Sequence, residues 1–404
     1  MTFTRRILAV LTVVCVLLGC CGCLPLRNAE QRDVPDSYTY LNEFQNNRQY
    51  KALSAEMKDC YGSVYTALTD GFGTDDNVTV SDDETEAKTQ IGISINLPHA
   101  LDGLDQAKAL YKAVANDNPH FFYVANVYGV EGYEKDGKQY YNTLTLIYSM
   151  DAVKRKTAKQ ELDAAVQTIL QGAPNTTDEY ETELYIHRQL LDRCTYDQAA
   201  ADEGYSQHPY AYTAYAALVE GKAVCEGYAR AMQMLLKAVN IPCALVFGES
   251  VSDGEKHMWN YVTVNGNNYH LDPTWNDSGD KIRHNYFNLT TKQISISHRI
   301  GEGQEFIPSC SATTENYYHR NGLYFDTYQR QAIAAAIARQ IQDGATHVEL
   351  MFAPDKYDSA LLFLKSPITT KEMVNAHLAD SGLSLWDYAH YSEREEHILI
   401  LRKK

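Results

Sequence analysis

The stretch from residue 221 to 231, Gly-Lys-Ala-Val-Cys-Glu-Gly-Tyr-Ala-Arg-Ala, places Cys225 at the head of an apolar run. The run continues with helical spacing and stops at Asn240 and Pro242, which predicts a helix of about four turns. Cys225 then lies in the first turn of that helix. Free backbone N–H groups and the helix dipole stabilise an anion there, so the sequence predicts a reactive thiolate.

A β-hairpin is predicted after this helix. Two β-rich runs flank Asn265-Gly266, and this residue pair is typical of a two-residue hairpin loop. The turn fixes which residues oppose each other on the two strands, so that Tyr261 opposes His270. The same register extends toward the open end of the hairpin.

The predicted register brings a histidine and a carboxylate together. Trp259 opposes Asp272, and His257 has the same parity as Trp259, so His257 and Asp272 share one face of the hairpin. Their diagonal separation of roughly 7–8 Å between backbones allows an imidazole–carboxylate hydrogen bond. With Cys225 they form a nucleophile, a base and an orienting group. His270 lies on the same face and is the alternative base.

Three motifs in this region, in this order, resemble the transglutaminase-like (papain-like cysteine) superfamily. They are Val-Cys-Glu-Gly-Tyr-Ala, His-Met-Trp-Asn and Tyr-His-Leu-Asp-Pro-Thr-Trp, and the resemblance covers about residues 180–290. It implies that Cys225 is the nucleophile, His257 the base and Asp272 the orienting group. Met258 stands where many relatives have a small residue, which would narrow the cleft.

An acyl-transfer site also needs hydrogen-bond donors for the oxyanion. The backbone N–H of Cys225 is one donor. Tyr215 lies upstream of it, in a segment (210–219) that reads as a short helix, and is the candidate for the second donor. In the alternative interpretation, Tyr215 only packs against the helix that carries the nucleophile.

The N-terminus reads as a targeting segment that spans residues 1–23. Arg5 and Arg6 precede an apolar core at 7–18, which is too short to span a bilayer with ease. The polar residues 24–45 that follow read as a tether between a membrane and the folded body.

The apolar core ends in Leu17-Leu18-Gly19-Cys20, which resembles the lipobox of bacterial lipoproteins. The resemblance implies that Cys20 is lipidated and becomes the new N-terminus, and therefore that the protein is extracytoplasmic and anchored to the cell membrane. Cys21 and Cys23 are alternative attachment sites, and an ordinary secretory signal is the alternative interpretation.

Composition narrows the classes of partner and cofactor. The net charge of −16 argues against nucleic acid, since phosphate binding needs clustered Lys and Arg. The cysteines of the body have no metal-ligand spacing and are odd in number, so neither a metal site nor a disulfide framework is expected. No organic cofactor is expected either. These cysteines are Cys60, Cys194, Cys225, Cys243 and Cys310.

The expected fold class is α+β, with a papain-like or transglutaminase-like core in which the helix that carries the cysteine packs on an antiparallel sheet. The core is assigned to residues 176–292, between an α+β region (46–175) and a small α/β region (293–404). Strands are expected at 91–97, 121–124, 141–148, 317–325, 347–352 and 397–401, and helices at 104–114, 152–170, 181–194, 327–341, 359–364 and 370–378. Residues 294–313 read as irregular.

The expected reaction is acyl transfer through a thioester on Cys225, with a protein or peptide as substrate and cell-wall peptides among the candidates. Water as acceptor would make the protein a protease or amidase, and an amine would make it a crosslinking transglutaminase. Hydrolysis is favoured, because the sequence lacks signs of calcium control or of a lysine channel. The alternative is a non-catalytic surface module that binds a partner and retains the fold.

Overall fold

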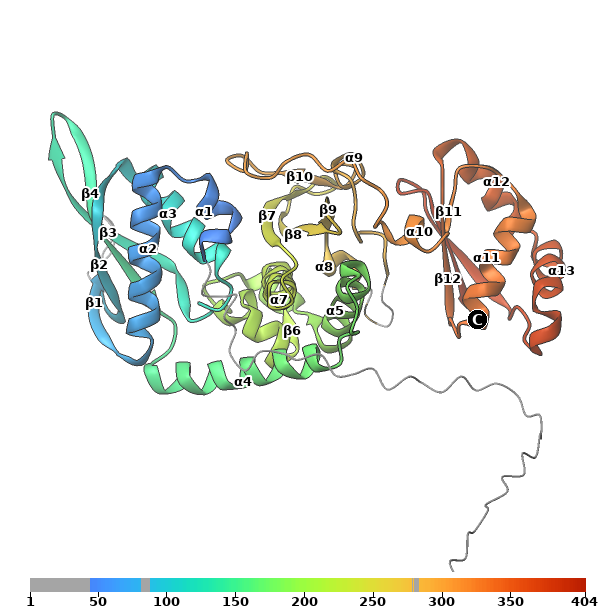
Figure 1. The fold of residues 1–404 in the computed structure, drawn as a ribbon, viewed down its shortest axis with the longest axis horizontal. Coiled ribbons are helices and arrows are strands. Elements are labelled where there is room, and N and C mark those ends of the chain that lie inside the picture. Colours follow the sequence, from blue (N-terminus) through green and yellow to red (C-terminus); the bar gives the residue numbers. More distant parts are fainter. Residues whose placement is uncertain (1–43, 81–87, 278, 280–282) are drawn as a thin grey trace, which may run out of the picture. The chain divides into compact units, whose positions relative to one another are not determined.

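The computed structural model describes residues 44–80, 88–277, 279 and 283–404, which belong to the compact unit Gln31–Lys404. The described strands form three four-stranded sheets and one two-stranded sheet, and the larger sheets come from successive parts of the sequence (Figure 1). Cys20 and the expected signal segment lie outside the described residues. Among the described helices, none combines the length and apolar character that crossing a membrane requires.

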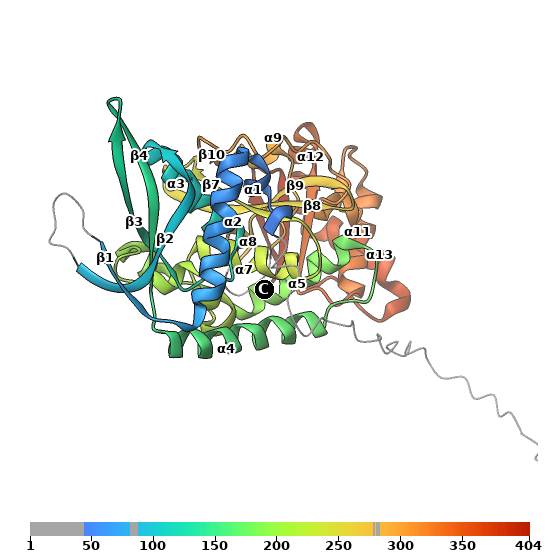
Figure 2. The same ribbon diagram turned by 60° about the vertical axis from the view of Figure 1, so that its left-hand side comes forward.

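The first sheet has the antiparallel order β1-β2-β4-β3, and helix α2 packs against it (Figures 1 and 2). Two strand predictions are confirmed, but the strand expected at 121–124 is wrong, because β3 begins only at Val124. The elements of this region are α1 (Arg48–Ala52), α2 (Ala55–Asp70), β1 (Asp76–Val80), β2 (Lys88–Asp102), α3 (Gly103–Asp117), β3 (Val124–Lys135), β4 (Lys138–Tyr148) and α4 (Ala152–Gln171).

The second sheet forms the predicted core, with the antiparallel order β10-β7-β8-β9. The hairpin register is confirmed, since Tyr261 pairs with His270, and both Asn265 and Gly266 have the positive φ that the turn requires. The elements are α5 (Glu179–Arg193), α7 (Cys225–Ala238), β7 (Cys243–Ser250), β8 (Lys256–Val264), β9 (Asn267–Leu271), α8 (Pro273–Asn276), α9 (Thr291–Ile294) and β10 (His298–Ile300).

Strand alternation divides β8 between two environments. Asn260 donates a hydrogen bond to the Ala229 carbonyl of α7 at 2.9 Å, and Val262 joins the large core around that helix. Trp259 and Tyr261 point to the opposite face, where they belong to a smaller buried cluster. His257 precedes Trp259 by two residues on β8, so the two side chains lie on the same face of the strand.

The approach to the nucleophile is less regular than expected. Residues 210–219 do not form one α-helix: a 3₁₀ turn at Pro209–Tyr212 is followed by a π-helical turn at Ala216–Glu220. Gly221 then adopts the left-handed conformation (φ 72°), which ends the turn and redirects the chain into α7.

Helix α7 also holds the N-terminal region in place. Side chains of its Arg230, Gln233 and Lys237 donate to the last three carbonyls of α3, at 2.7, 2.9 and 2.7 Å. These carbonyls have no partner within α3, because a helix leaves its final C=O groups unpaired. The three donors therefore bind α3 along one stripe of α7.

The C-terminal region has its own core and the sheet order β11-β12-β14-β13. The predicted helices and two of the strands are confirmed, whereas the strand expected at 317–325 is largely wrong, because residues 317–320 form helix α10 (Tyr317–Arg320). The remaining elements are β11 (Tyr324–Phe325), α11 (Arg330–Gln342), β12 (His347–Phe352), α12 (Pro354–Leu364), α13 (Pro367–Leu378), β13 (Tyr388–Glu393) and β14 (Ile398–Lys403).

Candidate active site

Cys225 is the first residue of α7. The extended conformation of Val224 and its backbone hydrogen bond to the Ala211 carbonyl (3.0 Å) deliver the chain to this position. The backbone N–H of Cys225 lies in the first turn, where N–H groups lack intrahelical acceptors. The thiol is half-buried, whereas Cys60, Cys194 and Cys310 are buried. The thiol is therefore within reach of a substrate at the end of the helix dipole that favours negative charge.

His257 and Asp272 form a buried pair, with Nε2 of the imidazole 2.7 Å from Oδ2 of the carboxylate. Asp272 is also the N-cap of α8, since its Oδ1 accepts from the backbone N–H groups of Thr274 and Trp275 at 2.9 and 3.2 Å. Pro273 at the first helical position fixes this geometry. One oxygen thus anchors the carboxylate to the backbone, and the other orients the imidazole.

The charges of this pair stabilise each other. Burial alone lowers the pKa of His257, but the Asp272 carboxylate and a hydrogen bond with the Cys225 thiol raise that pKa to about 10. Burial raises the pKa of Asp272, and the His257 and His298 hydrogen bonds and charges bring it well below its usual value. Asp272 is therefore ionised and can only accept, so Nε2 of His257 carries the proton and Nδ1 is left to serve the thiol.

His298 is a second imidazole on the same carboxylate oxygen, and the sequence analysis did not identify it. Its Nε2 lies 2.9 Å from Oδ2 of Asp272, and its Nδ1 lies 2.8 Å from Oγ of Ser297. His298 is the first residue of β10, which pairs with β7. This strand lies after residue 292, where the core was expected to end. Alternation of isoleucine with polar residues from 294 to 300 was the local signal for this strand.

Aromatic rings enclose this second imidazole. The centroids of Trp275, Trp259 and Tyr286 lie 4.3, 4.9 and 5.5 Å from that of His298. Within the described residues, His257, Asp272 and His298 are also close enough together to hold a metal ion, since their possible ligand atoms lie within 4.8 Å of one another. Direct hydrogen bonds from both Nε2 atoms to one oxygen already account for this arrangement.

His270, the alternative base, lies elsewhere in the hydrogen-bond network. Its Nδ1 is 3.2 Å from the indole N–H of Trp259, and its Nε2 is 3.2 Å from Oγ1 of Thr291. The pKa of His270 is lowered to about 4, mainly by burial and to a smaller extent by the charge of the neighbouring His298. A neutral imidazole with both nitrogens engaged in structural contacts is poorly suited to be the base, so the geometry favours His257.

The side chain of Tyr215, the expected oxyanion donor, has other partners in the structure. Its hydroxyl donates to Oε2 of Glu161 at 2.6 Å, and its ring stacks on Phe122. The charge of Cys225 acts on two other tyrosines, Tyr196 and Tyr212. Burial raises the pKa of each hydroxyl most, and the charge of Cys225 is the next largest cause. The hydroxyl of Tyr212 donates to the Ala200 carbonyl at 3.5 Å.

A cavity of about 230 Å³ lies near the site, although Cys225, His257 and Asp272 are not among the residues that line it. Met258 and Glu226, the sequence neighbours of His257 and Cys225, both line it, together with Tyr212. Tyr111 and Phe122 contribute walls from the N-terminal region. Met258 therefore lines a cavity close to the site, and this cavity is shared between two regions of the chain.

Comparison with known proteins agrees with this geometry over part of the chain. Residues 164–273 match the model of the transglutaminase-like superfamily. The core is transglutaminase-like. No curated protein matches the chain.

Several solved structures are distantly similar to this chain. A TGase is 14% identical (39% of this chain and 47% of that one, TM-score 0.28). A candidate cysteine protease from Cytophaga hutchinsonii is 14% identical (37% and 63%, TM-score 0.23). A candidate protease from Parabacteroides distasonis is 13% identical (50% and 36%, TM-score 0.22). The chain spans less than two thirds of each of these proteins.

Replacing Asp272 by Asn should lower the pKa of His257, because the charge of the carboxylate is lost and only the contact with Cys225 then opposes the effect of burial. An NMR pH titration of the His257 ring would measure the change. The fold should persist, since the amide oxygen can still cap α8. Asp253→Asn, on an exposed loop, is the matched control, and an unchanged His257 titration in Asp272→Asn would contradict the assignment.

Replacing His298 by Ala should raise the pKa of His257 further, because Asp272 loses a competing donor and its oxygen then interacts with His257 alone. The lost charge-assisted hydrogen bond and the cavity should destabilise the fold by roughly 2–4 kcal/mol. His298→Gln retains a donor and should lie between wild type and Ala in both the ring titration and the denaturant midpoint. A downward shift of the His257 titration in His298→Ala would contradict the shared-carboxylate interpretation.

Proposed function

We propose that this protein is a cysteine acyl-transfer enzyme that acts as a protease or amidase. The observation that carries the proposal is the 2.7 Å contact between His257 and Asp272, beside a half-buried thiol at the start of α7. A structural ion pair would not require an accessible cysteine at a helix N-terminus. The similarity of residues 164–273 to the transglutaminase-like superfamily supports the same class.

In the proposed reaction, the Cys225 sulfur attacks the carbonyl carbon of an amide, and the electron pair of the C=O bond moves to oxygen. The backbone N–H of Cys225 faces that oxyanion. The carbonyl re-forms, the C–N bond breaks, and imidazolium His257 gives its Nδ1 proton to the departing nitrogen. This leaves a thioester on Cys225 and a neutral imidazole.

Deacylation regenerates the thiolate. A water molecule attacks the thioester carbonyl, His257 takes its proton, and the C–S bond breaks to release a carboxylic acid. Asp272 keeps the imidazole in one tautomer throughout and offsets its positive charge. An amine in place of water would give a crosslinked product by the same steps.

The substrate is proposed to be a protein or peptide, with cell-wall peptides among the candidates. The cavity near the site has both aromatic walls and the charged side chains of Glu226 and Arg230, which pair with each other at 2.7 Å. Such a mixed lining suits an extended chain with polar backbone and varied side chains.

Membrane attachment through Cys20 is part of the proposal and rests on the Leu17-Leu18-Gly19-Cys20 motif. Intact mass of the protein from the membrane fraction should show a diacylglyceryl group on an N-terminal Cys20. Cys20→Ala should move the protein out of that fraction, whereas Cys21→Ala should leave it there. A mature chain that begins downstream of Cys23 would contradict the assignment.

Cys225 should be the thiol that iodoacetamide labels first in the folded protein. It is accessible and faces His257, whereas burial raises the pKa of the thiols of Cys194 and Cys310 to about 12 and 11. Peptide mass spectrometry after short labelling across a pH series would measure this. His257→Ala should slow labelling of Cys225 near neutral pH and reduce peptide hydrolysis by roughly 10²-fold or more.

Cys243→Ala is the matched control, since this thiol lies on β7 and the proposed chemistry does not use it. A non-catalytic binding module would behave differently. If Cys225 labels no faster than Cys194 or Cys310 and His257→Ala labels like wild type, the enzyme proposal fails in favour of that module.

A further inference from the structure

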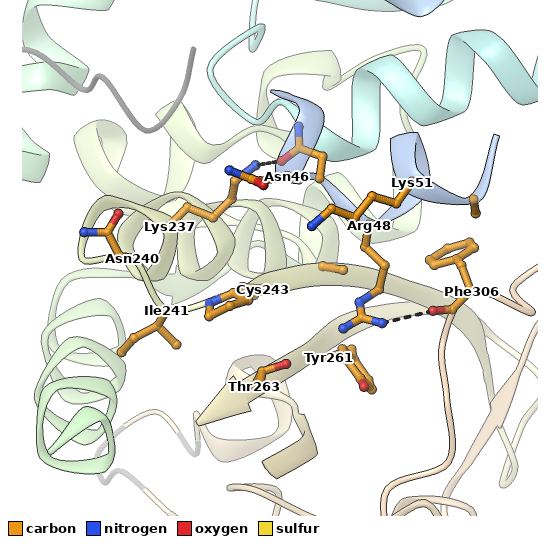
Figure 3. Close-up of a pocket in the computed structure, with 14 residues that line it drawn as sticks. Asn46, Arg48, Lys51, Lys237, Asn240, Ile241, Cys243, Tyr261, Thr263 and Phe306 are labelled. Atoms are coloured by element: carbon orange, nitrogen blue, oxygen red, sulfur yellow. Dashed lines mark hydrogen bonds between the residues drawn. The ribbon is translucent and has the colours of Figure 1, made fainter. Parts of the chain in front are cut away.

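A second cavity, of about 720 Å³, lies away from the catalytic thiol. Its lining includes Lys237 near the C-terminus of α7 (Figure 3), whereas Cys225 begins that helix. A helix of this length separates its two ends by about 20 Å. This cavity is thus distinct from the cavity near the candidate active site.

The lining of this cavity is cationic in an otherwise acidic protein. Arg48 and Lys51 reach it from α1, and Lys237 reaches it from α7 (Figure 3). The residues that line it include no Asp or Glu, although the whole chain has a net charge of −16. Three positive side chains around one cavity repel one another, so an anion between them would be stabilised.

Arg48 is placed to receive such an anion. Its guanidinium lies 4.4 Å above the ring of Tyr261, and one nitrogen donates to the Phe306 carbonyl at 3.4 Å. The part of the chain that the structure describes offers it no ion pair within the usual distance. A guanidinium has five N–H donors in a planar fork, which matches a carboxylate or phosphate. Stacking on Tyr261 fixes that fork at the cavity wall.

The position of the cations is built into the fold. Asp117, at the end of α3, accepts from the backbone N–H groups of Gln49 and Tyr50 at 3.3 and 2.9 Å, which holds α1 against the end of α3. Lys237 donates to the Asp117 carbonyl and to Asn47, so two of its three donors are used. Burial lowers the pKa of Lys237 to about 8, partly offset by Asp117. An anion nearby would favour its charged form.

We propose that this cavity binds a small organic anion, in which a carboxylate or a phosphate monoester is joined to an apolar or aromatic body. The oxyanion would lie between Arg48 and Lys51, with Lys237 behind them. The body would pack against Tyr261, Phe306 and Ile241, which give the cavity its apolar wall. This site is independent of the proposed acyl-transfer chemistry.

Isothermal titration of the full-length protein tests the proposal with phenyl phosphate, phenylacetate and the neutral isostere phenylacetamide. At least one of the two anions should bind at millimolar concentration or below, and phenylacetamide should not. The tighter anion identifies whether the natural ligand carries a phosphate or a carboxylate. Arg48→Gln should weaken binding by about tenfold or more, because a charge-assisted contact is lost. Lys51→Gln should weaken it by about two- to fivefold.

Arg394→Gln is the matched control, since Arg394 is exposed and pairs with Asp358 far along the sequence. If Arg48→Gln fails to fold, Arg48→Lys and Lys51→Gln carry the test, and both should weaken binding. Cys225 labelling should be unchanged in these variants, which separates this site from the catalytic one. The proposal is overturned if neither anion binds, if phenylacetamide binds as well as the anions, or if the Arg48 and Lys51 variants bind like wild type.

Discussion

The buried carboxylate of Asp272 is the interaction on which the rest of the site depends. An ionised carboxylate without partners would be very costly inside a protein, and this one has four donors. Two are backbone N–H groups of α8, and two are the imidazoles of His257 and His298. The donors come from β8, β10 and the α8 turn, so the carboxylate can be satisfied only when these segments have assembled. The geometry of the candidate site and the stability of the core therefore depend on the same group.

Helix α7 connects this core to the N-terminal region. Its first residue is Cys225, and its Arg230, Gln233 and Lys237 along one stripe satisfy the final carbonyls of α3. Both cavities border this contact, one near each end of α7. The N-terminal region lies mostly outside the residues that match the superfamily, yet it forms walls of the cavity near the site. We expect its sequence to influence which substrates reach the thiol.

Errors of the sequence analysis concentrate in segments whose conformation depends on distant partners. The tyrosine expected to assist the oxyanion, Tyr215, instead bonds Glu161, far earlier in the chain. No pattern near Tyr215 in the sequence indicates that contact. Residues 210–219 have helical composition, but the Gly221 turn and the packing around it impose a tighter and then a wider helical turn. Local propensity is overruled in such places by tertiary contacts.

The sequence by itself determined the α7 helix, the Asn-Gly hairpin and the shared face of His257 and Asp272. These features follow from local rules, because a two-residue turn fixes the register and strand alternation fixes the face. Only the tertiary structure decided that His298 joins the same carboxylate and that His270 bonds Trp259 and Thr291 instead. The first outcome depends on the pairing of β10 with β7, and the second depends on the burial of His270. Both involve contacts between residues that are far apart in the sequence, and local sequence patterns do not predict such contacts.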